Sequence, residues 1–278
     1  MFELKRSQIA GMNLSYRYFS FDYFLDSMER IGFQSVEIWG ASPHFYVPDL
    51  TPSDIRAAAK KIKDHGLRIV CFTPEQCCYP ENIAEKDSVA RKRSVAFYEK
   101  TIEACAELGS PQILMTSGWG YFDEPPEEAW KRSADGLAQL SRAAERVGVT
   151  IVLEPLRAEE TNLVTTLPQL KRMLDEVGSP ALKAMIDTSP MYLSGETITD
   201  YFRTLGGDLR HIHFVDGDPA GHLAWGTGIF PLERYIAELK SYEYQNALTL
   251  ELTAAKYFSD PNASMAAAFQ YLQGYFTE

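Results

Sequence analysis

The sequence predicts an α/β protein built as a single (β/α)8 barrel, the TIM-barrel architecture. Helical patterns end at a glycine, and a β-branched run begins within a few residues. About eight such units follow one another without an interrupting linker. Strands that alternate with helices imply right-handed crossovers and a parallel sheet, and eight units favour a closed barrel. No Gly-rich dinucleotide fingerprint follows the first strand, which counts against an open doubly wound sheet. We therefore expect one domain, residues 1–278.

The boundaries of the units carry local signals. Glycine suits the left-handed residue that closes a helix, and glycines stand at positions 32, 66, 109, 148 and 178 between a helical pattern and a strand. Thr51 before Pro52 is typical of a helix start. The eight strands are expected near 8–14, 34–39, 68–73, 112–116, 150–154, 183–187, 210–215 and 247–252, each followed by a helical segment.

Composition and charge exclude several classes of protein. The chain has 278 residues, of which 45% are hydrophobic, and a net charge of −11. An acidic surface repels phosphate backbones and anionic lipid, so we expect neither nucleic acid nor membrane as a partner. No apolar run approaches the roughly 20 residues of a membrane helix, and the first residues do not form a signal peptide. The cysteines lack zinc-finger spacing and are too few for a disulfide scaffold, which indicates a cytoplasmic, reduced protein; they are Cys71, Cys77, Cys78 and Cys105.

Polar residues stand at the ends of four consecutive strands. The run "TIVLEPL" places Glu154 in apolar surroundings, and burying a carboxylate without a partner costs several kcal/mol. The next strands end in Asp187 and carry His213, and "ALTLELT" sets Glu251 in the eighth. Active sites of such barrels lie at the C-terminal ends of the strands, and neighbouring strands are about 4.8 Å apart. The four groups are therefore expected to converge.

Three carboxylates and one imidazole form a mostly oxygen-based donor set. This composition favours one Mn²⁺ ion, with Mg²⁺, Co²⁺ or Ni²⁺ as alternatives. A divalent cation would also offset the desolvation of the buried acids. A lone acid at a strand end is more often a helix cap or a salt-bridge partner, and His213 alone would be a hydrogen-bonded core histidine. The prediction of a metal site depends on four consecutive strands each carrying one of these residues.

With these motifs assembled, the chain resembles the sugar isomerase and epimerase superfamily with a xylose-isomerase-like barrel. Within it, the chain looks most like the fructoselysine 3-epimerase branch, with ketose 3-epimerases as wider relatives. The resemblance covers nearly the whole chain. It is carried by "EIWGASPH", "TPE" followed by "YPEN", "LEPL" with Glu160 and Asn162, "LRHIHFVD", "GTG" and "LEL", in this order.

The resemblance implies a metal held by Glu154, Asp187, His213 and Glu251, with the two glutamates doubling as the catalytic acid/base pair. Removing the proton beside a ketone leaves an enediolate, whose charge a divalent cation stabilises. A second acid then returns a proton to the opposite face. The implied activity is a metal-dependent epimerase that inverts C3 of a ketose or ketosamine, of the fructoselysine type.

Two departures from the free-ketohexose epimerases bear on the substrate. Those enzymes carry a histidine where this chain has Pro190, and an arginine where the segment reads Asp216-Gly217-Asp218-Pro219. A plain ketohexose is therefore less expected than a sugar with a group on C1. Arg157 is a possible contact for a charged group, and the GTG segment is either a phosphate cradle or a simple turn. The expected substrate contacts, for several of which loop packing is an equal alternative, are Trp39, His44, Tyr79, Trp119, Glu160 and His222.

Other functions remain open at this point. An aldose–ketose isomerase, such as one acting on hydroxypyruvate, or a ketohexose 3-epimerase would use the same site, and a related lyase would dehydrate an inositol-derived ketone. An apurinic endonuclease shares the barrel but needs several metals and a basic face, which five histidines and the acidic charge oppose. A non-catalytic sugar sensor would have no use for all four rim groups. We also expect a homo-oligomer.

Overall fold

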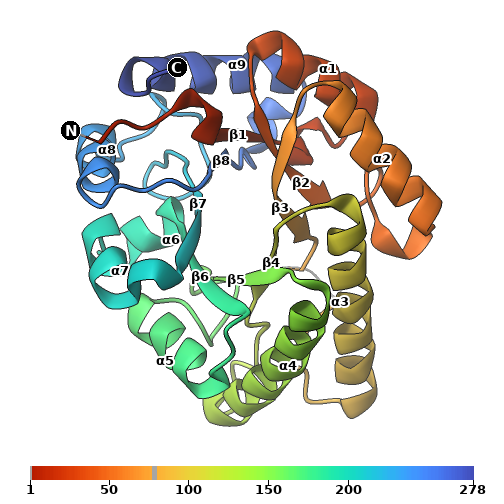
Figure 1. Ribbon diagram of the computed structural model, residues 1–278. Coiled ribbons are helices and arrows are strands. Elements are labelled where there is room, and N and C mark those ends of the chain that lie inside the picture. Colours follow the sequence, from red (N-terminus) through yellow and green to blue (C-terminus); the bar gives the residue numbers. More distant parts are fainter. Residues whose placement is uncertain (1, 77–79) are drawn as a thin grey trace.

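Eight parallel strands close into a barrel, and the helices lie outside it (Figure 1). The structure is a computed structural model, and it describes residues 2–76 and 80–278. Each strand pairs with its neighbours in sequence, and β1 pairs with β8 to close the ring. The predicted fold class is confirmed. The strands are β1 (Ile9–Met12), β2 (Ser35–Gly40), β3 (Arg68–Pro74), β4 (Gln112–Thr116), β5 (Thr150–Glu154), β6 (Leu182–Asp187), β7 (Leu209–His213) and β8 (Leu248–Leu250).

The helices begin and end largely where the local signals placed them. Thr51 forms a reciprocal capping box with Asp54 at the start of α2. The five glycines named above all have positive φ, which L side chains rarely adopt. The helices are α1 (Phe21–Ile31), α2 (Pro52–Asp64), α3 (Ser88–Leu108), α4 (Pro126–Val147), α5 (Leu167–Val177), α6 (Thr188–Leu193), α7 (Ile198–Leu205), α8 (Leu232–Ser241) and α9 (Pro261–Leu272).

Successive side chains of each strand point alternately to the helices and to the barrel interior. On β5, Ile151 and Leu153 belong to the large core between sheet and helices. Val152 between them belongs to a small separate cluster. That cluster also takes residues from β1, β3, β4 and β6, so it lies inside the barrel. The same alternation directs Glu154 inward, two residues beyond Val152.

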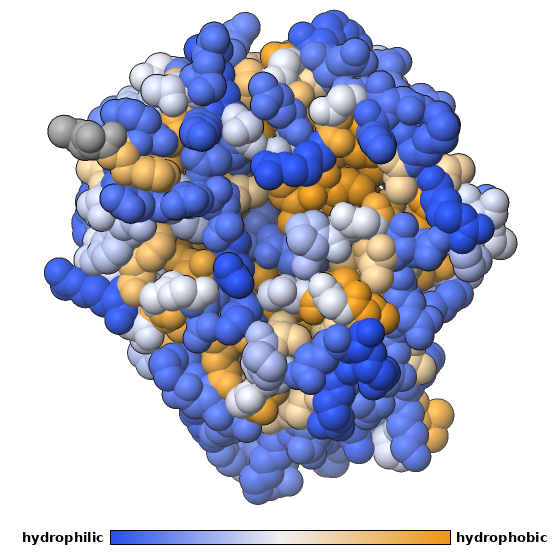
Figure 2. Space-filling view, viewed as in Figure 1, coloured by the Kyte–Doolittle hydropathy of each residue, from blue (hydrophilic) through white to orange (hydrophobic). Residues whose placement is uncertain are grey.

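The outer surface is mainly polar on the face shown in Figure 2. Hydrophilic residues dominate this face, and hydrophobic ones show mainly in the gaps between elements and toward its middle. This pattern agrees with a core lying between the strands and the helices. Within the described ranges, no helix combines the length and the apolar character that crossing a membrane requires.

Candidate metal centre

Alternation along the strands brings the four predicted groups to one end of the barrel interior. Asp187 lies two residues after Met185, which belongs to the cluster inside the barrel, and His213 lies two residues after His211, which contacts the buried Glu37. Glu251 comes directly after β8, while Leu248 and Leu250 face the helices. Together with Glu154, these residues offer one ligand atom each, all within 4.8 Å of one another. The structure therefore brings together the four groups that the sequence singled out.

His213 lies at the centre of this cluster. Its Nδ1 is 3.1 Å from Oε1 of Glu154 and 3.2 Å from Oε2 of Glu251. Neither contact has hydrogen-bond geometry, so this buried nitrogen has no hydrogen-bond partner among the described residues. A buried polar atom without a partner is costly in a folded protein. Nδ1 thus points into the space between carboxylate oxygens, as a metal-ligating nitrogen would.

A second histidine, not counted among the ligands, closes one side of the cluster. His222 lies in the segment between β7 and α8, and its Nε2 is 2.9 Å from Oδ2 of Asp187. Its Nδ1 is 2.8 Å from Oε2 of Glu251. The imidazole therefore contacts two of the four groups at once, which places His222 at the predicted centre itself.

The electrostatics of the two glutamates differ. Burial raises the pKa of Glu154 to about 7. Burial also acts on Glu251, but the positive charges of His213 and His222 outweigh it and lower the pKa of Glu251 to about 2. In the metal-free chain, one carboxyl therefore binds a proton near neutrality and the other stays ionised. Pairs of acids separated in this way are typical of general acid–base sites.

The donor set fits a divalent cation. Three carboxylates in mutual contact repel one another unless a positive charge lies between them. His213 offers an unpartnered nitrogen to the same space. Oxygen-rich sites with one imidazole suit Mn²⁺, Mg²⁺ or Co²⁺ better than metals that prefer thiolate. The residues that would hold the ion are Glu154, Asp187, His213 and Glu251.

A cavity of about 300 Å³ opens onto this cluster. This volume is at the lower end of the range for small-molecule sites. Three of the six expected substrate contacts, Trp39, Glu160 and His222, line it. Pro190, which replaces the histidine of the free-ketohexose enzymes, lines it as well. The cavity also has wall residues that the sequence reasoning did not select: Leu14, Thr73, Gln76, Leu114 and Thr253.

Two of the other three expected contacts, His44 and Trp119, lie elsewhere. His44 bonds through Nδ1 to the side-chain amide of Asn13 (3.0 Å) and through Nε2 to the carbonyl of Phe19 (2.7 Å). Trp119 exchanges backbone hydrogen bonds with the side chain of Asn82. Neither His44 nor Trp119 is among the described residues that line the cavity. Tyr79 lies outside the described residues.

The GTG segment is a turn around an acid. Oδ2 of Asp216 accepts hydrogen bonds from the amides of Gly226 (3.1 Å) and Gly228 (2.7 Å), and Oδ1 accepts one from Phe230 (3.0 Å). These amides point at a carboxylate of the chain itself, so they are not free to bind a phosphate. Of the two interpretations of this segment, the structure supports the turn.

Arg157 is a cationic residue in the wall of the cavity. Its guanidinium donates two hydrogen bonds to the carboxylate of Glu160, at 3.0 and 2.6 Å. Both side chains are partly exposed and both line the cavity. Glu75, on the segment after β3, faces the same space. The walls thus offer both signs of charge.

The fold and this site define a class, a (β/α)8 barrel enzyme with an acid- and histidine-lined centre at the C-terminal end of its strands. Residues 25–275 match the family described as "Xylose isomerase-like TIM barrel". The chain belongs to that family.

Named relatives narrow the class further. The chain is 32% identical to the fructoselysine 3-epimerase of Shigella flexneri, over 86% of each chain. It is 23% identical to the D-psicose 3-epimerase of Agrobacterium fabrum, over 83% of this chain and 78% of that one. A D-psicose 3-epimerase from Clostridium cellulolyticum, solved with D-tagatose, superposes with a TM-score of 0.81 at 18% identity, covering 98% of this chain and 100% of that one. That structural likeness supports the fold alone. The relatives place the chain among the ketose 3-epimerases, which are isomerases.

Proposed function

We propose that the protein is a divalent-metal-dependent epimerase that inverts C3 of a ketosamine, a ketose with an amine-linked group on C1. The observation that carries the proposal is the convergence of four groups from four consecutive strands at the floor of a cavity. Mn²⁺ is the ion we propose, because three of the four ligands are carboxylates. When bound, a divalent cation supplies positive charge that stabilises the anion formed as C3 loses its proton.

Glu154 and Glu251 are proposed as the acid/base pair. Both carboxylates lie within 3.2 Å of the same nitrogen of His213, so one sugar above the cluster can contact both. An ionised carboxylate takes the proton from C3, and the other carboxyl, in its protonated form, donates to the opposite face. The configuration at C3 is inverted. The donor carboxyl takes its proton from solvent, and the first carboxylate releases the proton it removed to solvent before the next turnover, so solvent hydrogen enters C3.

The substrate class follows from the walls of the cavity. Pro190 has no side-chain donor for a sugar hydroxyl, unlike the histidine of the free-ketohexose enzymes. Arg157, Glu160 and Glu75 supply charged groups instead, which suit a substrate that carries charges beyond the sugar. An amino acid linked through its amine to C1 has a carboxylate for Arg157 and an ammonium for an acidic wall. The similarity to fructoselysine 3-epimerase supports the same class.

The test is deuterium incorporation from D₂O. Metal-loaded protein is incubated with fructoselysine, fructose, tagatose and psicose, and the label is located by NMR. We expect label at C3 and a C3 epimer, formed fastest from fructoselysine. Label at C1 or C2 would show an aldose–ketose isomerase. Label at C3 with faster turnover of a bare hexose would show a ketohexose 3-epimerase. Protein stripped with a chelator serves as the control and should give no label.

We also propose a cytoplasmic location and a homo-oligomeric state. Cys71 and Cys105 are buried free thiols, which agrees with a reducing compartment. The oligomeric state is open to measurement by light scattering.

A further inference from the structure

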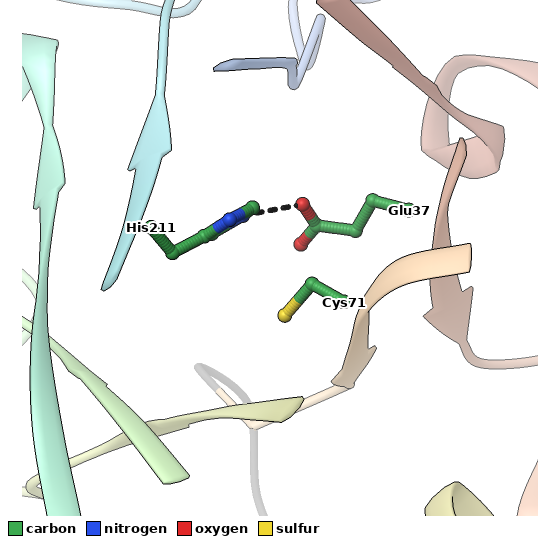
Figure 3. Close-up of side chains that lie close together, drawn as sticks. All are labelled: Glu37, Cys71 and His211. Atoms are coloured by element: carbon green, nitrogen blue, oxygen red, sulfur yellow. Dashed lines mark hydrogen bonds and ion pairs between the residues drawn. The ribbon is translucent and has the colours of Figure 1, made fainter. Parts of the chain in front are cut away.

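A second cluster of buried polar groups lies inside the barrel next to the proposed centre. Glu37 on β2, Cys71 on β3 and His211 on β7 are fully buried, and the structure brings one ligand atom of each within 4.8 Å of the others. Figure 3 shows Glu37 and His211 reaching toward each other, with Cys71 beside them. No substrate can reach these groups from the cavity, because none of the three lines it.

The carboxylate of Glu37 is already occupied by hydrogen-bond donors. Its Oε2 is 2.7 Å from Nε2 of His211. Its Oε1 is 3.0 Å from Nε2 of His213 and also accepts a hydrogen bond from the hydroxyl of Thr73. Three donors on two oxygens explain how this acid is buried without an ion of its own. The cluster is therefore better explained as a hydrogen-bond network than as a second metal site.

The network reaches the proposed metal centre through His213. This ring contacts Glu37 with Nε2 on one side and faces Glu154 and Glu251 with Nδ1 on the other. A carboxylate is an acceptor only, so the nitrogen it contacts carries the proton. With the proton on Nε2, the lone pair of the neutral ring is on Nδ1, where a metal ion binds. Partners of this kind fix the tautomer and orientation of metal-ligating histidines.

We propose that Glu37 is a positioning residue that holds the proton on Nε2 of His213 and so directs Nδ1 at the metal site. Thr73 and His211 hold the carboxylate in place from β3 and β7. This inference rests on the metal site proposed above. It predicts a role for Oε1 of Glu37 as an acceptor, which is distinct from a role in packing or charge alone.

The substitution test compares two variants of similar size. Glu37→Met removes the acceptor, and we expect Mn²⁺ affinity to fall by about 10- to 100-fold, the usual effect of losing such a partner. Glu37→Gln keeps an amide oxygen for His213. Its NH₂ group then faces His211, whose Nδ1 has no hydrogen-bond partner among the described residues and can take the proton instead. We therefore expect Glu37→Gln to retain most of the affinity. Binding is measured from the electron paramagnetic resonance signal of free Mn²⁺, without any assay of turnover.

Cys71→Ala is the matched control, because Cys71 is buried in the same cluster and its sulfur contacts neither histidine by hydrogen bond. We expect it to leave Mn²⁺ affinity unchanged. Equal losses in the Met and Gln variants, wild-type affinity in Glu37→Met, or a loss in Cys71→Ala as large as that in Glu37→Met would each overturn the proposal. Failure of the wild-type protein to bind Mn²⁺ would instead overturn the metal site.

If Glu37→Met does not fold, a measurement on the unaltered protein can test whether Glu37 holds the proton on Nε2 of His213. The chain has five histidines, so ¹⁵N-histidine labelling gives few signals. We expect a slowly exchanging, downfield proton on Nε2 of His213 in metal-free and Mg²⁺-loaded protein alike, assigned by its loss in His213→Gln. A His213 that carries its proton on Nδ1 in the Mg²⁺-loaded protein would overturn the proposal. The metal-free spectrum reports on the contact with Glu37 even if no metal binds.

Discussion

Nε2 of His222 lies 2.9 Å from Oδ2 of Asp187, so a loop histidine contacts a strand carboxylate of the proposed metal site. The sequence interpretation placed His222 with the substrate and Asp187 with the metal. Their contact raises the question of which function His222 serves. The other nitrogen contacts Glu251 and the ring lines the cavity, so His222 lies where it could contact either a metal ion or the substrate.

Replacing His222 by glutamine answers this question. If His222 contacts the substrate, His222→Gln should keep one Mn²⁺ per chain and lower kcat/KM by about 10- to 100-fold, the usual cost of leaving a buried hydrogen-bonding group unpaired. Metal content is measured by elemental analysis, and turnover by NMR. Loss of the metal in this variant would make His222 a ligand.

Asp187→Ala and His213→Ala should each remove the metal while leaving the barrel folded. Both side chains lie at strand ends, and the core between sheet and helices does not depend on them. We expect less than one-tenth of the metal content of the wild type, because even the loss of an outer-shell partner of a ligand costs about 10- to 100-fold in affinity. Far-ultraviolet circular dichroism checks the fold. Asp175→Ala, which breaks an exposed pair with Lys171, is the control and should keep its metal. Full occupancy in His213→Ala would exclude that histidine from the ligand set.

Glu154→Gln and Glu251→Gln should each lower kcat by several orders of magnitude. Either change removes an acid/base group and weakens the metal site. Because the pair acts as a unit, the double variant should be little worse than either single one. Glu196→Gln is the matched control, since Glu196 is a partly buried acid that bonds to Leu167 and Tyr201 rather than lining the cavity. Near-normal turnover in either single variant would rule out the two-base mechanism.

Metal affinity should rise with pH. Burial alone would lower the pKa of His213, but the carboxylates of Glu251 and Glu37 raise it well above the ordinary value. Burial raises the pKa of Glu154 to about 7. The metal-free site therefore holds protons near neutrality, and a cation must displace them. We expect apparent Mn²⁺ affinity to increase by about tenfold per pH unit for each displaced proton between pH 6 and 8, with the contribution of Glu154 levelling off above its pKa of about 7.

Calorimetry in two buffers of different ionisation enthalpy counts the protons released on Mn²⁺ binding. His65→Gln is the control, because His65 forms a surface contact with Asp26 and should not alter the count. An affinity independent of pH over this range would contradict the assignment of His213 and Glu154 as ligands.

Arg157 should matter more for a substituted sugar than for a bare one. A substrate with an amino acid on C1 gains from a cation at the cavity wall, and losing remote contacts lowers rate as well as affinity. We expect Arg157→Met to lower kcat/KM for fructoselysine by at least about tenfold and to change that for psicose by less. His44 and Trp119 were also expected to contact the substrate, but neither lines the cavity. Trp119→Phe is therefore a control that should affect both substrates alike. If Arg157→Met lowered kcat/KM equally for fructoselysine and psicose, Arg157 would have no role in distinguishing the two substrates.

The sequence by itself determined the barrel and its four rim groups. The repeated passage from helix through glycine to a β-branched run predicted eight parallel units, because a strand feeding a helix packs back onto the sheet in only one hand. The acids in apolar runs marked Glu154 and Glu251, since an unpaired buried charge is too costly to occur without a function. The positions of these groups at the C-terminal ends of consecutive strands were sufficient to assign them to one rim of the barrel.

Only the tertiary structure decided which loop residues accompany that rim. His44 and Trp119 stand near strand ends in the sequence as Trp39 does, yet His44 bonds to Asn13 and Trp119 to Asn82, and neither lines the cavity. The conformation of a loop depends on contacts between residues that are not neighbours in the chain, such as those of Asp216 with the amides of Gly226 and Gly228. Local sequence patterns do not predict such contacts. The contact between Glu37 and His213, 176 residues apart, likewise exists only because the closed barrel brings β2 and β7 to face each other across its interior.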